Sequence, residues 1–156
     1  MTNIYFENEM ITENDLYFLC YMIERVARKL HQRNKYIVNT ISREEWMRLI
    51  SLANVLHCEN PLKIEDEWIK EYQLKEGNFD IKDIDTDLVT NIPTETQMGK
   101  VYKRLIVDTQ LPEEDYIDGI IRVYNDAICE KLDDYNCGAY FEPSYVIARA
   151  YNENGF

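Results

Sequence analysis

Residues 12–33 read TENDLYFLCYMIERVARKLHQR, and this stretch decides the fold class of the chain. Its apolar residues recur every three or four positions, which is the spacing of an amphipathic helix. They are Leu16, Leu19, Cys20, Ile23, Val26, Ala27 and Leu30. Thr12 and Asp15 give a weak helix-start signal, in which an aspartate takes the place of the usual Glu or Gln. The pattern predicts a helix from Glu13 to about Arg33, roughly 30 Å long.

Two stronger helix-start signals follow along the chain. Ser42 lies three residues before Glu45, and Thr94 lies three residues before Gln97. In this arrangement the hydroxyl accepts a hydrogen bond from the third helical amide, and the Glu or Gln side chain returns to the cap amide. The signals predict one helix from Ser42 to near Cys58 and another from Thr94 to near Asp108. Their inward positions are Trp46, Leu49, Ile50, Ala53, Leu56, Met98, Val101, Tyr102, Leu105 and Ile106.

Three further helices are expected from apolar spacing and from acidic residues or proline in their first turns. Their ranges are about 63–74, 112–132 and 143–151. Gly119 in the second of them is expected to let a neighbouring helix approach closely. Residues 35–40 are read as a short connection.

The remaining segments lack helical periodicity. Residues 1–11 are expected to be an irregular arm that packs through Ile4, Tyr5 and Phe6, and residues 152–156 a frayed tail. Residues 79–93 are predicted to be an irregular acidic loop that holds Ile81, Ile84 and Leu88 against the bundle. The sequence therefore predicts a mainly α fold, a single-domain bundle of about six helices over residues 1–156.

Composition sets the compartment and the class of partner. The chain of 156 residues is 46% hydrophobic and has no apolar run near the roughly 18 residues that cross a bilayer. Its first residues lack the basic start and apolar stretch of a secretory signal, so a cytoplasmic location is expected. The cysteines Cys20, Cys58, Cys129 and Cys137 are widely spaced and are expected to be free thiols. Cys137 precedes Gly138 in a turn and is the one candidate for a reactive thiol, although the sequence does not decide whether it reacts.

Net charge is −12, from 29 acidic and 17 basic residues. Binding to nucleic acid or to an anionic membrane is not expected, because such proteins carry a basic stripe that neutralises phosphates. The densest basic stretch lies at the end of the first helix, at Arg25, Arg28, Lys29, Arg33 and Lys35. We interpret it as a solvated face that complements the helix dipole, with docking of an acidic partner as the alternative.

Motifs that would mark catalysis, a metal or a cofactor are weak. His57 and Cys58 are the only adjacent base and nucleophile, but neighbours on a helix point about 100° apart. Asp83, Asp85 and Asp87 resemble the start of a calcium loop, but Leu88 stands where glycine is needed and Thr94 where glutamate is needed. We therefore predict a solvated acidic loop, and assign no catalytic, metal or cofactor residue.

Aromatic residues concentrate near the C-terminal end more densely than one short helix needs for packing. They are Tyr135, Tyr140, Phe141, Tyr145 and Tyr151. Aromatic surfaces with acidic rims suit protein interfaces, so these five residues form the candidate interaction surface. The alternative is that the rings only clamp the last helix to the bundle.

The leading hypothesis is a helical interaction protein, a regulator or inhibitor that binds a basic protein through an acidic surface with exposed aromatic rings. One rival is an enzyme whose site gathers His57, Cys58 and the acidic residues 113–115 from separate segments. Another is a homodimer that buries the C-terminal aromatic residues across a twofold axis.

Overall fold

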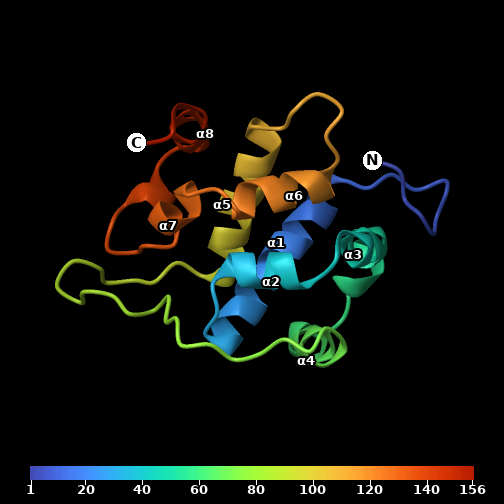
Figure 1. The fold of residues 1–156 in the computed structure, drawn as a ribbon, viewed down its shortest axis with the longest axis horizontal. Helices are drawn as coiled ribbons and strands as arrows, with labels where there is room; N and C mark the ends of the chain where they lie inside the picture. Colours follow the sequence, from blue (N-terminus) through green and yellow to red (C-terminus); the bar gives the residue numbers. More distant parts are fainter.

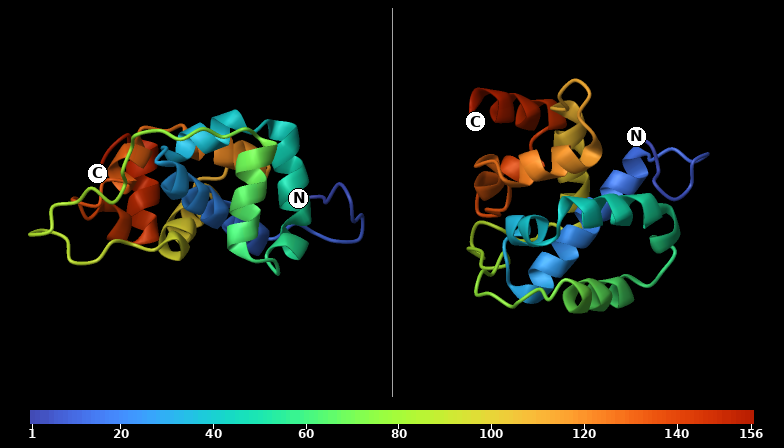
Figure 2. Two further views of the ribbon diagram at one scale, coloured as in Figure 1. Left: turned by 90° about the horizontal axis from the view of Figure 1, so that it is seen from below. Right: turned by 45° about the vertical axis from the view of Figure 1, so that its right-hand side comes forward.

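The fold is built around one central helix, α1 (Glu13–Leu30), which crosses the middle of the molecule (Figure 1). A computed structural model describes residues 1–156. Helices α5, α3, α2 and α4 all pack on α1, and α8 packs on α5. Figure 2 shows α3 and α4 on one side of α1 and the C-terminal helices on the other.

The remaining elements are short. They are α2 (Asn34–Thr40), α3 (Arg43–Leu56), α4 (Pro61–Glu71), α5 (Glu95–Asp108), α6 (Tyr116–Tyr124), α7 (Ile128–Leu132), the 3-10 turn η1 (Ala139–Phe141) and α8 (Ser144–Glu153). The chain forms no strand, only one isolated bridge between Thr2 and Met10. The predicted mainly α class is therefore confirmed, with eight α-helices where about six were expected.

The helix-start signals form as predicted. The Ser42 hydroxyl accepts a hydrogen bond from the Glu45 amide at 3.2 Å. Thr94 accepts from the Gln97 amide at 3.1 Å, and the Gln97 side chain accepts from the Thr94 amide at 2.7 Å. At α1 the Asp15 carboxylate accepts from the Thr12 amide at 2.8 Å. Each bond satisfies an amide that the first helical turn leaves without a partner.

Several predicted helix limits were wrong, each for a local reason. Helix α1 ends at Leu30 instead of Arg33, because His31 adopts a left-handed conformation with φ of 52° and starts the turn into α2. The predicted helix over 112–132 is two helices, since the chain leaves the helix at Asn125. The Asp126 side chain then accepts from the Ile128 amide at 2.9 Å and starts α7. Helix α4 begins at Pro61, where Asn60 caps it, and ends at Glu71.

The buried residues form one apolar core of 36 side chains. Leu16, Trp46, Leu105 and Ile120 are all buried, as their spacing predicts. The Trp46 indole packs edge-on against Trp68 and donates to the Val38 carbonyl at 3.0 Å, so its one polar group is satisfied inside the core. No helix of this core has an apolar stretch long enough to cross a bilayer.

The loop 79–93 follows the prediction in part. Ile81 is buried and Ile84 is half-buried against the core, but Leu88 is 71% exposed. The loop is tied down at Asp85, whose amide donates to the Asn136 side chain at 2.6 Å. Beyond that point it turns outward, so the expectation that Leu88 packs on the bundle was wrong.

The arm over residues 1–11 is held by Asn3 and by the buried side chain of Ile11, and not by the three apolar side chains expected to pack. The buried Asn3 side chain donates to the Ser51 carbonyl at 2.8 Å and accepts from the amides of Tyr5 and Phe6. This turn directs Ile4, Tyr5 and Phe6 into solvent, contrary to the expectation that they pack.

Close helix contacts occur at two glycines. A Cβ on Gly119 would lie 2.7 Å from Cγ2 of Ile106, so the predicted close approach is confirmed. A second close contact, which no local sequence pattern marks, occurs at Gly99 in α5, where a Cβ would lie 3.0 Å from Cα of Tyr21 in α1. Helices α1 and α5, which form the most extensive helix–helix contact of the fold, therefore approach each other closely at Gly99.

We expect Gly99→Ala to lower the free energy of unfolding by about 1–2 kcal/mol, because overpacking against a backbone outweighs the better helix propensity of alanine. Urea unfolding followed by circular dichroism measures it. Gly138→Ala is the matched control, since a Cβ there meets nothing within 4 Å. Equal stability of the two variants would contradict close backbone packing at Gly99.

Candidate functional site

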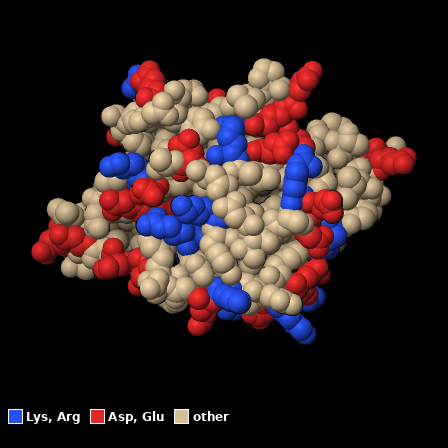
Figure 3. Space-filling model, in the orientation of Figure 1, with Lys and Arg blue, Asp and Glu red and all other residues tan.

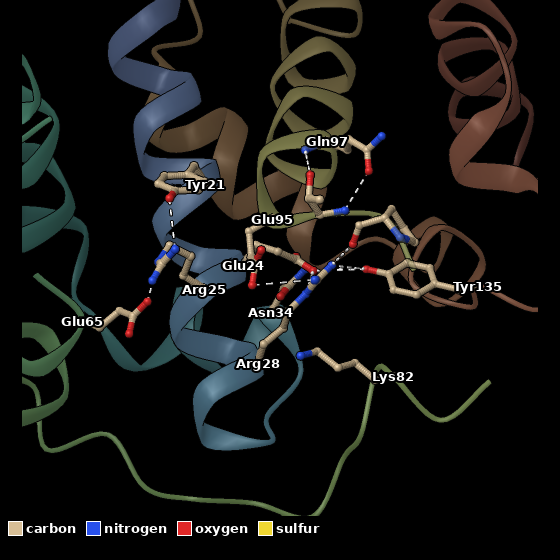
Figure 4. Close-up of polar contacts among 12 residues, drawn as sticks. Tyr21, Glu24, Arg25, Arg28, Asn34, Glu65, Lys82, Glu95, Gln97 and Tyr135 are labelled. Atoms are coloured by element: carbon tan, nitrogen blue, oxygen red, sulfur yellow. Dashed lines mark hydrogen bonds and ion pairs between the residues drawn. The ribbon is translucent and has the colours of Figure 1, made fainter. Parts of the chain in front are cut away.

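A buried arginine joins three segments of the chain beneath the C-terminal surface (Figure 4). The Arg28 guanidinium of α1 donates to the Glu24 carboxylate at 3.0 Å, to the Pro93 carbonyl at 2.8 Å and to the Tyr135 hydroxyl at 2.9 Å. Pro93 directly precedes the cap of α5, and Tyr135 follows α7. Arg28 thus fixes the start of α5 and the C-terminal segment relative to α1.

The partner of Arg28, Glu24, is itself only 1% exposed. Its carboxylate also accepts from the Asn34 side chain at 2.9 Å and from the Tyr135 hydroxyl at 3.2 Å. Burying a charged pair costs several kcal/mol, which is offset only when the remaining hydrogen-bonding positions are filled. Asn34 and Tyr135 fill them here. We call Glu24, Arg28, Asn34 and Tyr135 the Arg28 cluster.

A second buried carboxylate lies close to this cluster. Asp133 accepts a hydrogen bond from the Tyr102 hydroxyl at 2.7 Å, and the Tyr102 ring stacks on Tyr124 with centroids 4.5 Å apart. Burial raises the pKa of Asp133 well above its ordinary value of 3.8, and the nearby charge of Glu24 raises this pKa further. Folding therefore favours the protonated form of this carboxyl group.

From Tyr135 a chain of aromatic rings leads out to the surface. The Tyr135 ring meets Tyr140 edge-on at 5.4 Å between centroids, and Tyr140 meets Phe141 at 6.2 Å. Phe141 forms part of a groove of about 250 Å³ between α5 and the segment η1–α8. The exposed ring of Phe141 is thus linked to the Arg28 cluster through the rings of Tyr140 and Tyr135.

The structure divides the five residues of the candidate interaction surface. Tyr135 is 3% exposed and belongs to the core, so its inclusion in a surface was wrong. Tyr140 and Tyr151 are half-buried, and the Tyr151 hydroxyl accepts from Arg122 at 3.0 Å. Phe141 and Tyr145 are 82% and 70% exposed. These two rings remain as the accessible part of the predicted surface.

Charges around the two rings differ from what the overall composition indicates. Lys100 and Arg104 of α5 line the groove, and neither forms an ion pair. The net charge of −12 gives no sign of this pair of cations, but their spacing of four residues on one predicted helix places them on the same helix face.

The acidic loop lies at the same end of the molecule as the groove. Figures 1 and 2 place the loop 79–93 and the helices α7 and α8 away from the N-terminal arm, and Figure 3 shows carboxylates at the tip of this end. Asp83, Asp85 and Asp87 are exposed, and Asp85 accepts from the Asp87 amide at 2.9 Å. No three acidic, histidine or cysteine groups in the chain are placed to share a metal ion.

His57 and Cys58 meet, contrary to the prediction. Helix α3 ends at Leu56, so the geometry of helical neighbours does not apply, and Cys58 Sγ lies 3.7 Å from His57 Nε2. The acidic residues 113–115 are not part of this pair. Asp115 bonds Arg43 at 2.6 Å, at the opposite end of α3, and a helix of 14 residues is about 21 Å long.

The basic stretch at the end of α1 is a solvated face only in part. Lys29 and Lys35 are exposed, as that interpretation predicts, whereas Arg25, Arg28 and Arg33 are at least partly covered by contacts within the protein. Arg25 pairs with Glu65, and Lys29 bonds Asp66 at 2.8 Å (Figure 4 shows the first pair). The Arg33 guanidinium lies over the Phe79 ring, 4.1 Å from its centroid. These contacts attach α4 to α1, and the start of the loop 79–93 to the turn between α1 and α2.

No family model, curated protein or solved structure matches this chain. The assignment of a site therefore rests on the contacts of its own residues. Of these, the Arg28 cluster and the ring of Phe141 that it supports form the most fully connected arrangement. We take Phe141, the exposed ring of Tyr145 and the adjoining groove as the candidate site.

We expect Arg28→Met to lower the free energy of unfolding by about 3–5 kcal/mol, because Glu24 is left as a buried charge without its partner. Chemical denaturation measures the loss. Arg104→Met, at an exposed cation, is the control and is expected to stay within about 0.5 kcal/mol of the wild type. Adding Glu24→Gln to Arg28→Met is expected to restore part of the loss. A loss below about 1 kcal/mol for Arg28→Met would contradict the role of the cluster.

We expect the free energy of unfolding of Asp133→Asn, relative to that of the wild type, to be higher at pH about 8 than at pH about 5. A carboxyl group whose pKa is raised by folding loses stability as pH rises from its ordinary value toward its folded value, by about 1.4 kcal/mol for each pH unit between them. Asparagine removes this loss and still accepts from Tyr102. Urea unfolding of the variant and the wild type at both pH values measures this change. If the difference in unfolding free energy between the two proteins is the same at both pH values, the pKa of Asp133 is not raised.

Proposed function

We propose that this protein acts by binding another protein at the end of the molecule formed by the loop 79–93, η1 and α8, which we call the aromatic end. The observation that carries the proposal is the exposure of Phe141 and Tyr145, at 82% and 70%. Large aromatic side chains that a fold holds in solvent are typical of binding surfaces.

The energy available from the two rings is large enough for specific binding. Fully burying an exposed aromatic side chain contributes roughly 1.5–3 kcal/mol for each ring before other costs. Phe141 is already supported by Tyr140, so little conformational freedom is lost when a partner covers it. The neighbouring groove offers a place for an apolar side chain of the partner.

The charge of the chain favours a basic partner. The exposed aspartates of the loop 79–93 add to a net charge of −12, so a positively charged protein is attracted at long range. A regulator or inhibitor that covers a basic surface is consistent with this pattern. Lys100 and Arg104 beside the groove would then meet a carboxylate of the partner and fix its orientation, since opposite charges set register more than affinity.

A second copy of the chain is the alternative occupant. Phe141 and Tyr145 could pack on their counterparts across a twofold axis. The net charge of −12 opposes this arrangement, because two copies repel each other. Light scattering distinguishes a dimer from a monomer that awaits a different protein.

We expect Phe141→Ala with Tyr145→Ala to weaken binding about 1,000-fold, because each of the two interface anchors typically contributes about 2 kcal/mol or more. Affinity capture from the native host, followed by quantitative mass spectrometry, identifies the partner. Surface plasmon resonance with that purified partner measures the affinity. Leu62→Ala, an exposed apolar residue on α4, is the matched control.

The electrostatic contribution of the loop 79–93 to binding is tested separately, through the association rate and its dependence on salt. Replacing Asp83, Asp85 and Asp87 by asparagine is expected to slow association and to reduce its salt dependence, with little change in dissociation. Affinity that is unchanged in the double aromatic variant would overturn the proposed site. Association that does not respond to salt would overturn the basic partner alone.

A further inference from the structure

Cys58 and His57 lie in the turn between α3 and α4, on the side of α1 away from the aromatic end (Figure 1). Cys58 is exposed, and its Sγ lies 3.7 Å from His57 Nε2. An exposed thiol within hydrogen-bond reach of an imidazole has both a nucleophile and an acceptor for its proton.

The backbone fixes which imidazole nitrogen faces the thiol. His57 Nδ1 lies 3.2 Å from the Ala53 carbonyl, an oxygen that can only accept a hydrogen bond. The proton of the neutral ring therefore belongs on Nδ1, which leaves the lone pair of Nε2 toward Cys58. This is the arrangement of nucleophile, base and orienting group that activated thiols use.

Nearby charges are compatible with transfer of the proton. The closest carboxylate in the sequence, Glu59, is paired with Lys63 at 3.0 Å, so its negative charge is compensated. His57 lies at the C-terminal end of α3, where the helix dipole stabilises a positive imidazolium. A cleft of about 610 Å³ adjoins His57 and is also lined by Asp15, Tyr21 and Glu59. Cys58 lies outside this lining and is exposed to solvent, so a small molecule reaches the thiol directly.

We propose that Cys58 is a site of thiol–disulfide exchange with low-molecular-weight disulfides, with His57 as its proton acceptor. The Cys58 thiol gives its proton to His57 Nε2, and the thiolate attacks one sulfur of the disulfide. A new S–S bond forms to Cys58 while the old S–S bond breaks. The departing thiolate takes the proton back from His57 and leaves as a thiol, so no further oxidant is needed.

The chain supplies its own control thiols. Cys20 is fully buried, and burial raises its pKa to about 12, while burial also raises the pKa of Cys129. Both are expected to react only after unfolding. Cys137 is half-buried, and its thiol donates to the Lys131 carbonyl at 3.3 Å, a group that cannot take the proton.

The test follows the reaction of the native protein with oxidised glutathione and with a chromogenic aromatic disulfide at pH about 7, where histidine exchanges protons. Mass spectrometry of peptides assigns each mixed disulfide, and Cys58→Ser confirms the assignment. Cys58 is expected to react about tenfold faster than Cys137. His57→Gln is expected to slow Cys58 about tenfold, because a free thiol is only a few per cent thiolate at this pH.

A rescue experiment separates proton transfer from folding. His57→Ala is expected to react slowly and to regain speed when imidazole is added, while the rate of Cys137 stays unchanged in both proteins. Circular dichroism and urea unfolding verify that the variants fold. A Cys58 rate within about twofold of the wild type in His57→Gln would overturn the proposal, as would a failure of imidazole to restore His57→Ala. Neither result depends on Phe141 or Tyr145, so the proposal for Cys58 and the proposal for the aromatic end can be refuted independently.

Discussion

The buried ion pair of Glu24 and Arg28 is the constraint on which the arrangement of the C-terminal half depends. A charge removed from water must keep all its partners, so the Pro93 carbonyl, the Asn34 amide and the Tyr135 hydroxyl have to converge on one turn of α1. This convergence places the start of α5 and the segment after α7 in one position. The last residue of the loop 79–93, Pro93, is held by its hydrogen bond to Arg28, whereas the middle of the loop turns outward.

The position of the exposed Phe141 ring depends on that cluster. Phe141 touches Tyr140, which touches Tyr135, so a side chain in solvent is linked through two contacts to a buried charge. A partner that covers Phe141 meets a ring whose backbone is already ordered, and ordering costs little at such a position. The same end carries acidic loop residues and two unpaired cations on α5. This end therefore carries charges of both signs, which the net charge of the chain does not indicate.

The opposite side of α1 has a different character. There α3 stops at Leu56, and the chain turns before Pro61 starts α4. The turn brings two consecutive side chains together, which a continuous helix would have separated by about 100°. The ion pairs of Arg25 and Lys29 with Glu65 and Asp66 hold α4 against α1 and so keep this turn in place. Two unrelated surface features thus depend on polar contacts made by one helix.

The sequence by itself determined the helical class, the caps at Ser42 and Thr94, and most of the core, because these depend on residues within four positions of each other. It predicted an aromatic site but not which rings face water. Tyr135 is buried by a contact with Arg28, 107 residues away in the chain, and no local pattern records that contact. The break before α7 and the meeting of His57 with Cys58 depend on where helices stop. Only the tertiary structure decided these features, because packing between distant segments, and not periodicity, sets which side chains are covered.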